Sequence, residues 1–425
     1  MAAHFWRLMS MQHWPDEIRQ VVGDHFARIA PNHQPYQGVG ELLVEALGVD
    51  ELEGFRAEWG DLVRRAIEPN PFLEPDFALA AMLHLPMSQR PMIAVVWQGA
   101  GEEPRARMIG LWAFEQSLFG AFGGIARNWR YKHGVLGAPL IDRLTAARCV
   151  DAVLVWLRER QMGRSALVMR DLRKDGPAAE LIAERCARHG LASIGLDERQ
   201  RAILSHDDDT QTRCARAQTR KHLREMDRLG RRLSETGDLT FGSASSPAEI
   251  RNPVEWFLAL EQAGWKGRRR SAFLSDAGDA AFLRATLRQL ARAGKCRVDW
   301  LAVDGQPIAM AIVLRSADRA YYWKTTYDER YSHYSPGVQL TRKLTERQLA
   351  NPRVSVTDSC AIANHPMIDR LWSGRQTMFD LLIGVDPARA RAFPGAVRRE
   401  RFARALLAAL KRAAKAALRA ARLRR

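Results

Sequence analysis

The stretch YSHYSPGVQL, residues 331–340, joins two different patterns and decides the fold that we assign to the second half of the chain. Residues 319–328, RAYYWKTTYD, read as an aromatic strand, and residues 337–350 read as a helix. Proline in the first turn of a helix loses no hydrogen bond, and glycine lets another group approach the backbone. The junction therefore indicates one of two things at Ser335, Pro336 and Gly337. It is either a helix N-terminus suited to a phosphate or an ordinary connection between a strand and a helix.

The segments around this junction predict a mixed sheet covered by helices. Asp304-Gly305 lies between two strand-like runs and is a strong hairpin signal. The pattern predicts two helices, three antiparallel strands, the Ser-Pro-Gly helix, a strand, a short helix and a last strand. These elements are expected at residues 251–265, 279–294, 296–303, 306–315, 319–328, 337–350, 353–359, 365–372 and 376–384.

The first half repeats this order less clearly. Helical patterns at 48–66 and 75–85 precede strand-like runs at 90–98 and 105–116. YKHGVLGAPLID, residues 131–142, then occupies the place that YSHYSPGVQLTR holds later. The pattern continues with helix, strand, helix and strand, and it predicts an internal duplication of one α/β unit. These last elements are expected at 140–160, 165–172, 178–190 and 191–205.

The excess positive charge lies in two segments. The net charge is +17, and residues 391–425 hold 12 Lys/Arg against one Glu, which gives +11. Residues 213–232 hold 8 Lys/Arg against two acids, which gives +6, and their arginines form one helical stripe that would attract a polyanion if it faces a cleft. His206 with Asp207, Asp208 and Asp209 suggests a helix cap or, alternatively, a metal site.

Composition favours a folded cytoplasmic protein. The hydrophobic fraction is 47%, and the longest apolar runs are strand-sized, well short of the ~20 residues of a membrane helix. The five cysteines form no C-x-x-C pair, which argues for a reducing compartment and against a structural metal. The N-terminus lacks the order of a secretory signal.

The order of elements in the second half resembles the Gcn5-related N-acetyltransferase (GNAT) fold. The duplication, the basic middle helix and the stretches LEQAGWKGR, SPGVQL and HPMIDRLW resemble the FemAB-like double-GNAT proteins, and among them the CelD-type acetyltransferases of cellulose and exopolysaccharide synthesis. The resemblance implies an α/β (α+β mixed sheet) fold with tandem GNAT-like domains. It covers roughly residues 40–385, although the common loop Q/R-x-x-G-x-G/A is missing.

The resemblance also implies a division of the chain into five parts. An N-terminal extension precedes the first GNAT-like domain, and a basic inter-domain helix leads to the second, which is expected to hold the acyl donor. A basic amphipathic helix ends the chain. The expected ranges are 1–37, 38–205, 206–237, 238–388 and 389–425.

Site residues follow from the resemblance and from the chemistry of acyl transfer. The resemblance places acyl-CoA, expected to be acetyl-CoA, on the loop Ser335, Pro336, Gly337, Val338 and Gln339. An attacking amine must lose a proton, and the candidate bases are Asp358, His365 and Tyr327. Trp265, Lys266 and Asp328 are expected to contact the acceptor, and no metal is expected.

Each of these candidates has a structural alternative. Asp358 could cap a turn, His365 could lead into a helix, and Trp265 could anchor the preceding helix. Cys360 is a buried thiol or, with no adjacent His or Asn pattern, a less well-supported nucleophile.

We therefore expect an acyltransferase that modifies an amine or hydroxyl of an exopolysaccharide or cell-envelope precursor, with a sugar, lipid-linked or peptide acceptor. The alternatives are FemAB-type transfer from aminoacyl-tRNA, favoured by the arginine stripe, and a non-catalytic GNAT scaffold. Residues 398–425 suit contact with the anionic inner membrane surface, where each basic residue contributes about 1 kcal/mol. The same residues also suit a solvated helix or a nucleic-acid arm.

Overall fold

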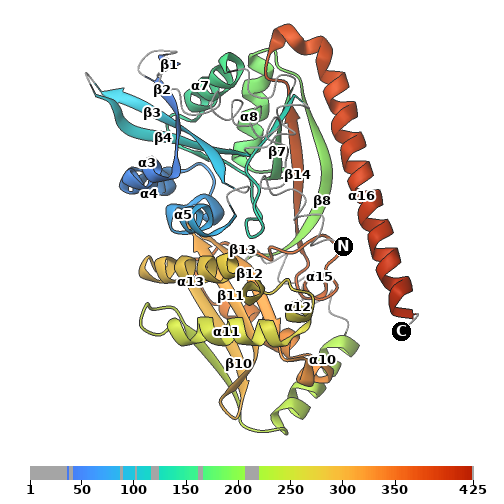
Figure 1. The fold of residues 1–425 in the computed structure, drawn as a ribbon. Helices are drawn as coiled ribbons and strands as arrows, with labels where there is room; N and C mark the ends of the chain where they lie inside the picture. The colour runs from blue at the N-terminus through green and yellow to red at the C-terminus, as the bar shows by residue number, and fades with distance from the viewer. Residues whose placement is uncertain are drawn as a thin grey trace, which may run out of the picture.

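The computed structural model describes residues 36–37, 42–86, 90–100, 103–115, 124–160, 166–205 and 220–423. Two sheets with helices packed on them form a mixed α/β structure (Figure 1). A five-stranded sheet has the order β1-β2-β3-β4-β6, and a nine-stranded sheet has the order β5-β7-β14-β8-β13-β12-β11-β10-β9.

The three central strands of the second half form as their sequence predicts. Strands β10 (Cys296–Val303) and β11 (Gln306–Ser316) pair antiparallel, and β12 (Arg319–Tyr327) continues the meander. Asp304 and Gly305 link the first two with φ angles of 49° and 74°. Two positive φ angles in a two-residue loop give a turn whose twist matches that of the strands, which is why Asp-Gly suits this position.

Helices cover both faces of these strands. On one face lie α11 (Arg251–Ala263) and α13 (Ala277–Arg292), followed by Gly294 in the left-handed conformation at φ 64°. The helix expected at 251–265 ends at Ala263, and Trp265 begins the separate one-turn helix α12 (Trp265–Arg268). The rest of this half consists of β9 (Leu239–Ala244), α14 (Pro336–Leu349), β13 (Val356–Asp358), α15 (Ile368–Leu371) and β14 (Gly374–Ile383).

The first half follows the same order of strands and helices. One long helix was expected at residues 48–66, but Phe55 interrupts it with φ −103° and ψ 26° and leaves two helices. The elements are β1 (Tyr36–Gln37), β2 (Leu42–Leu47), α3 (Val49–Gly54), α4 (Arg56–Arg65), α5 (Pro75–His84), β3 (Pro91–Ala100), β4 (Glu103–Glu115), β5 (Ile125–Arg127), β6 (Leu140–Ile141), α7 (Ala146–Glu159), β7 (Ala166–Arg173), α8 (Pro177–Arg188) and β8 (Ser193–Ser205).

The two halves exchange their last strands. Strand β8 of the first half pairs antiparallel with β13 of the second, and β14 of the second half pairs antiparallel with β7 of the first. Strands β8 and β14 also pair with each other along most of their length, from Ser193 to Ile203. The segments 38–205 and 238–388 are therefore not separate sheets, because each supplies the strand that completes the other.

A shared hydrophobic core joins the halves as well. Phe77 of α5 packs edge-on against Phe282 of α13, with ring centroids 5.3 Å apart, and against Trp323 of β12 at 5.2 Å. All three rings are buried in one cluster together with residues of both halves. Burying these aromatic rings on both sides of the boundary stabilises the two halves as one unit.

Two basic helices complete the described chain. Helix α10 (Arg220–Ser234) lies beside α14, and α16 (Phe393–Leu423) runs along the outside next to β8 (Figure 1). On α10, the apolar side chains of Met226, Leu229 and Leu233 are buried. The expected Asp207–Asp209 cap and the arginines at 213 and 216 lie outside the described residues.

Candidate active site

Strands β12 and β13 pair in parallel over three residues and then separate. The pairs are Arg319 with Val356, Ala320 with Thr357, and Tyr321 with Asp358. After Asp358 the chain turns toward β8, where Ser359 donates its N–H to the carbonyl oxygen of Ala202. In the described part of the chain no strand pairs with this side of β12 beyond Tyr321, so up to Tyr327 its edge has no partner strand, although Lys266 bonds the carbonyl oxygen of Thr325.

The helix N-terminus next to this edge is the start of α14. Ser335 precedes it in the left-handed conformation, with φ 55° and ψ 52°, and Pro336 occupies the first helical position. The N–H groups of Val338 and Gln339 both donate to the carbonyl oxygen of Ser335. Among the described residues no acceptor reaches the N–H of Gly337, which therefore joins the positive end of the helix dipole as a free donor.

Gly337 lies next to Tyr327. A Cβ atom placed on Gly337 would have one neighbour within 4 Å, the Cδ1 atom of Tyr327 at 3.9 Å. The Tyr327 side chain is itself 36% exposed. The structure thus brings together the end of β12 and the start of α14, and it leaves space around the glycine.

The expected acceptor residues gather at the same end of β12. Lys266 donates from Nζ to the carbonyl oxygen of Thr325 at 2.9 Å and to Glu261 Oε1 at 2.8 Å. The backbone N–H of Trp265 donates to Glu329 Oε1 at 2.6 Å, while its indole ring stays 42% exposed.

Asp328 follows Tyr327 and caps a short 3-10 helix, residues Glu329–Tyr334. Its Oδ1 accepts the N–H of Arg330, and the Arg330 side chain holds the pKa of this carboxyl below its usual value. Asp328 is therefore a carboxylate whose hydrogen bonds are made within its own turn.

Asp358 and His365 have structural partners away from Tyr327. The Asp358 carboxylate is buried, accepts a bond from Arg201 at 3.2 Å, and accepts the N–H of Cys360 at 2.7 Å. His365 Nδ1 accepts the N–H groups of Met367 and Ile368 at the start of α15. Burial raises the pKa of the Cys360 thiol well above its ordinary value, which keeps it in its less nucleophilic form.

Lys324 is a site residue that the sequence analysis missed. It lies on β12 between Trp323 and Thr325, on the part of the strand that has left β13, and it is half-buried. Its Nζ lies 5.2 Å from the ring centre of Trp323 and 5.5 Å from that of Phe273. Burial, reinforced by the nearby charge of Lys266, lowers the pKa of Lys324 to about 8. The sequence feature that could have identified Lys324 is the position of a lysine inside the aromatic run YYWKTTY, residues 321–327.

A loop of the first half lies against this part of β12. The carbonyl oxygen of His133 accepts the indole N–H of Trp323 at 2.9 Å, and the His133 ring stacks between Phe273 and Phe282. Lys132 forms an ion pair with Asp279 of α13 and adds to the positive potential at Lys324. The site therefore contains residues from both halves.

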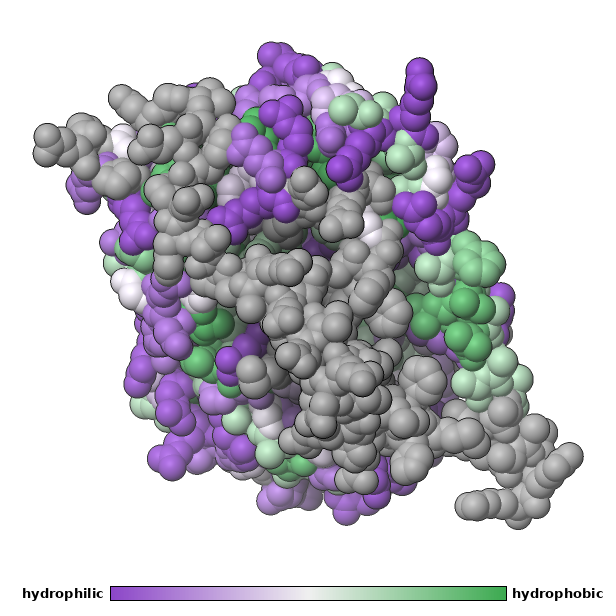
Figure 2. All heavy atoms as spheres, turned by 45° about the horizontal axis from the view of Figure 1, so that its top comes forward, coloured by the Kyte–Doolittle hydropathy of each residue, from purple (hydrophilic) through white to green (hydrophobic). Residues whose placement is uncertain are grey.

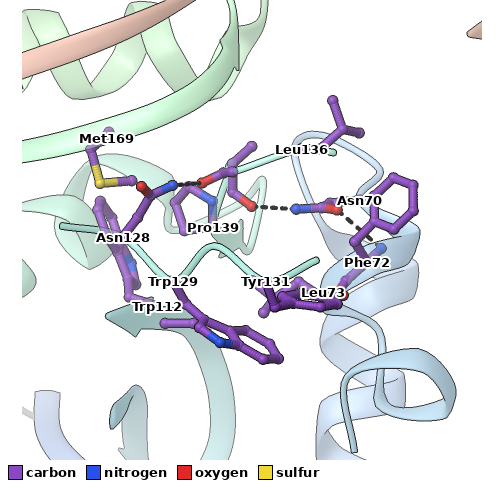
Figure 3. A pocket seen from close by; sticks show the side chains of 13 residues that line it. Asn70, Phe72, Leu73, Trp112, Asn128, Trp129, Tyr131, Leu136, Pro139 and Met169 are labelled. Carbon is purple, nitrogen blue, oxygen red and sulfur yellow. Dashed lines mark hydrogen bonds between the residues drawn. The ribbon is translucent and has the colours of Figure 1, made fainter. Parts of the chain in front are cut away.

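The equivalent place in the first half is filled by its own chain. Strands β5 and β7 also separate after three parallel pairs, at Asn128. Asn128 bridges the gap by donating to the carbonyl oxygens of Gly137 and Arg170, both at 3.1 Å. On the other side, Asn70 donates to the carbonyl oxygen of Ala138 at 2.7 Å, as Figure 3 shows.

Only a small pocket is left at this place, lined by Trp112, Trp129, Tyr131, Leu136, Pro139 and Met169 among others (Figure 3). The N–H of Gly137 donates to the carbonyl oxygen of Asp171, so the segment 137–139 occupies the position of a paired strand. In the second half no described strand pairs with β12 beyond Tyr321, and the first-half loop contacts this place through the carbonyl oxygens of His133 and Val135.

Helix α10 places positive charge beside the start of α14. Gln339 of α14 donates to the carbonyl oxygen of Met226 at 2.8 Å, and Arg342 pairs with Asp227 at 2.7 Å. Arg224 and Arg231 of the stripe are exposed. This arrangement favours an anionic ligand at this end of the second half.

Two further features are absent from the described residues. Among them, no cluster of three or more His, Cys, Asp or Glu side chains could hold a metal ion, and His206 with its aspartates lies outside them. No helix in the described ranges has the length and apolarity needed to cross a membrane.

Comparison with known proteins gives one family match. Residues 218–364 match the family described as an acetyltransferase (GNAT) domain. No curated protein matches the chain.

Solved structures that resemble this chain do so at low identity. FemX is 10% identical with a TM-score of 0.48, over 76% of this chain and 95% of its own. The C-terminal domain of a putative lysylphosphatidylglycerol synthetase from Agrobacterium fabrum is 12% identical with a TM-score of 0.45. The match covers 81% of this chain and 96% of that domain. A tandem GNAT protein from the clavulanic acid biosynthesis pathway is 15% identical with a TM-score of 0.39. The match covers 82% of this chain and 99% of that protein's chain.

The matched region contains β10, β11, β12, the start of α14 and β13, which are the elements that form the open edge and the helix N-terminus. Residues 218–364 are therefore similar to a GNAT acetyltransferase domain, and this similarity supports acyl transfer as the chemistry of the second half.

Proposed function

We propose that the second half transfers an acyl group, most simply acetyl, from acyl-CoA to an amine or hydroxyl of an exopolysaccharide or cell-envelope precursor. The observation that carries the proposal is the separation of β12 from β13 beyond Tyr321, next to the N-terminus of α14. An open strand edge can pair with amide groups of an extended ligand, and a helix N-terminus can hold its phosphates.

The residues around this opening fit such a donor. The unpaired edge of β12 up to Tyr327 would align the extended arm, and the N–H of Gly337 would approach the pyrophosphate. Ser335, Pro336, Val338 and Gln339 shape that turn. A bound acyl-CoA would supply an activated carbonyl and a thiolate leaving group.

We propose Lys324 as the group that takes the proton from the acceptor. Its pKa of about 8 leaves part of the population neutral near neutral pH, and its position on the open part of β12 faces no ion-pair partner among the described residues. Tyr327 lies nearest Gly337 and would orient the donor, while Trp265 and Lys266 would contact the acceptor. Asp358 and His365 would support the fold of the site.

The test measures donor binding and turnover separately. Purified full-length protein should bind CoA in calorimetry, and native mass spectrometry should find CoA bound to the protein as purified. Incubation with acetyl-CoA and a panel of amino sugars should release free thiol. A folded protein that binds no CoA would overturn the proposal.

A second function, transfer from aminoacyl-tRNA, is favoured by one observation. The exposed arginines of α10 lie beside α14, where a polyanion larger than CoA could also bind. If tRNA is the donor, the protein should bind it in a gel-shift assay, and the affinity should fall steeply as salt increases. CoA binding without tRNA binding would exclude this second function, and binding of neither would favour the non-catalytic scaffold.

A further inference from the structure

The first turns of α16 are fixed to the body of the protein by one face. Phe393 and Ala396 are buried against residues of β5, β7 and β14. Glu400 is buried and accepts a bond from Arg127 of β5 at 2.6 Å. Arg404 then donates to Asp380 of β14 at 2.6 Å, so the anchored face extends to residue 404.

Three apolar side chains of α16, Phe402, Leu406 and Leu410, point away from this anchored face. Each residue turns an α-helix by about 100°, so Phe402 lies roughly 160° around the helix from Arg404. Leu406 and Leu410 follow Phe402 at four-residue steps and share its face. The exposed fractions are 70% for Phe402, 49% for Leu406, 53% for Leu407 and 59% for Leu410.

These side chains form a hydrophobic strip on the outside of the molecule. Figure 2 shows hydrophobic residues gathered along the edge where α16 runs. Leucines and a phenylalanine at helical spacing are normally buried, and a row of them facing outward marks a contact surface.

The charge along α16 indicates what this surface contacts. From residue 401 to residue 425 the sequence holds nine Lys/Arg and no acid. Lys411 and Arg412 are exposed like the strip itself. A helix with one apolar face and an otherwise cationic surface can insert the apolar face between lipid chains while its charges contact anionic headgroups.

We propose that α16 docks the protein on an anionic lipid surface, with Phe402, Leu406 and Leu410 inserted and the cationic residues at the headgroups. A second copy of this chain fits the strip poorly, because two such helices would bring nine positive charges against nine. A nucleic acid would use the charges but would leave the apolar strip in water. The anchored residues up to Arg404 would hold the acyltransferase body at the membrane surface.

The experiment is co-sedimentation of the full-length protein with vesicles of phosphatidylcholine, with or without phosphatidylglycerol. The protein should bind only the anionic vesicles, and binding should weaken as salt screens the charges. The triple variant Phe402→Ala/Leu406→Ala/Leu410→Ala keeps helix propensity and should bind at least about tenfold more weakly. The control Leu144→Ala/Ile362→Ala removes two apolar side chains elsewhere that are even more exposed, at 75% and 77%, and should bind like the parent.

A charge variant tests the second component of the surface. Lys411→Glu/Arg412→Glu should weaken binding to anionic vesicles, whereas Arg288→Glu/Arg292→Glu, the same reversal on α13, should not. The proposal is overturned if the parent protein ignores anionic vesicles at low salt or if the triple variant binds them equally well. It is also overturned if the strip mediates dimer formation or RNA binding in the absence of any lipid binding.

Discussion

Tyr321 of β12 and Asp358 of β13 form the last pair of two parallel strands that separate directly beyond them. Asp358 is held in place by Arg201 of β8, a strand contributed by the first half. The opening that we assign to the acyl donor therefore depends on the exchange of strands between the halves.

Replacing Gly337 tests the donor site. Gly337→Val should weaken CoA binding, because the branched side chain would fill the space in front of the helix N-terminus. The fold should tolerate the change, since the added Cβ would meet only Tyr327, at 3.9 Å. Calorimetry measures the affinity, and Gly60→Val, at a glycine with open surroundings on α4, is the control. Equal CoA affinity of the two variants would place the donor elsewhere.

Replacing Lys324 tests the proposed base. The rate of the parent enzyme should rise with pH through about 8, as Lys324 loses its proton, and Lys324→Met should lose most of the rate and this rise. The control is Lys343→Met, at an exposed lysine of α14. An unchanged pH profile in Lys324→Met would assign the base to another residue.

Lys324 should also affect stability. Its pKa is lowered from 10.5 to about 8, so between these pH values the unfolded chain binds more protons and the free energy of unfolding rises with pH. Lys324→Met should remove this rise and stabilise the protein near neutral pH by up to about 3 kcal/mol. Urea unfolding at several pH values in this range measures the free energy of unfolding of parent and variant. If the two free energies depend on pH in the same way, the Lys324 charge is not buried as assigned.

Replacing Gly137 tests the closure of the first half. A Cβ at this position would collide with the carbonyl oxygen of Arg170 and with the Asn128 side chain. Gly137→Ala should therefore lower the free energy of unfolding by roughly 2–4 kcal/mol. Gly54→Ala, with no atom within 4 Å of the new Cβ, is the control for denaturant unfolding. A neutral Gly137→Ala would mean that the segment is not held between β5 and β7.

His133 should make the contact between the halves sensitive to acid. Burial lowers the pKa of His133 from 6.5 to about 4, although its bond with Asp279 opposes the shift. The unfolded chain thus binds more protons between these pH values, and stability should fall by up to about 3 kcal/mol as pH decreases through them. His133→Gln cannot titrate and should show a shallower decrease. Identical acid unfolding of parent and variant would rule out this contribution.

Two truncations test where the body of the protein ends. Removing residues 411–425 should leave the melting temperature unchanged, because the side chains described there up to residue 414 are exposed. Removing residues 398–425 also deletes Glu400 and Arg404, and it leaves Arg127 and Asp380 without these partners. This longer deletion should cost roughly 2–5 kcal/mol. Calorimetric melting measures the stability of the parent and of both truncated proteins. Equal stability of the two truncated proteins would show that the turns of α16 up to Arg404 do not stabilise the fold.

The elements that the sequence predicted well depend on local chemistry. Asp304-Gly305 fixes a two-residue turn by its backbone preferences, and Pro336 fixes the start of a helix, so both could be placed without knowledge of their neighbours. The break at Phe55 was missed because the apolar spacing of residues 48–66 continues through it.

The sequence by itself determined the α/β class, the repeated order of elements and the two basic helices, because periodicity, turn residues and charge are properties of neighbouring residues. Only the tertiary structure decided that β8 and β14 exchange places and that segment 137–139 fills the first opening. It also decided that Lys324 becomes partly buried next to Lys266, which lowers its pKa. These features arise between residues far apart in the chain, where strand pairing and burial depend on what packs alongside, and no local pattern records them.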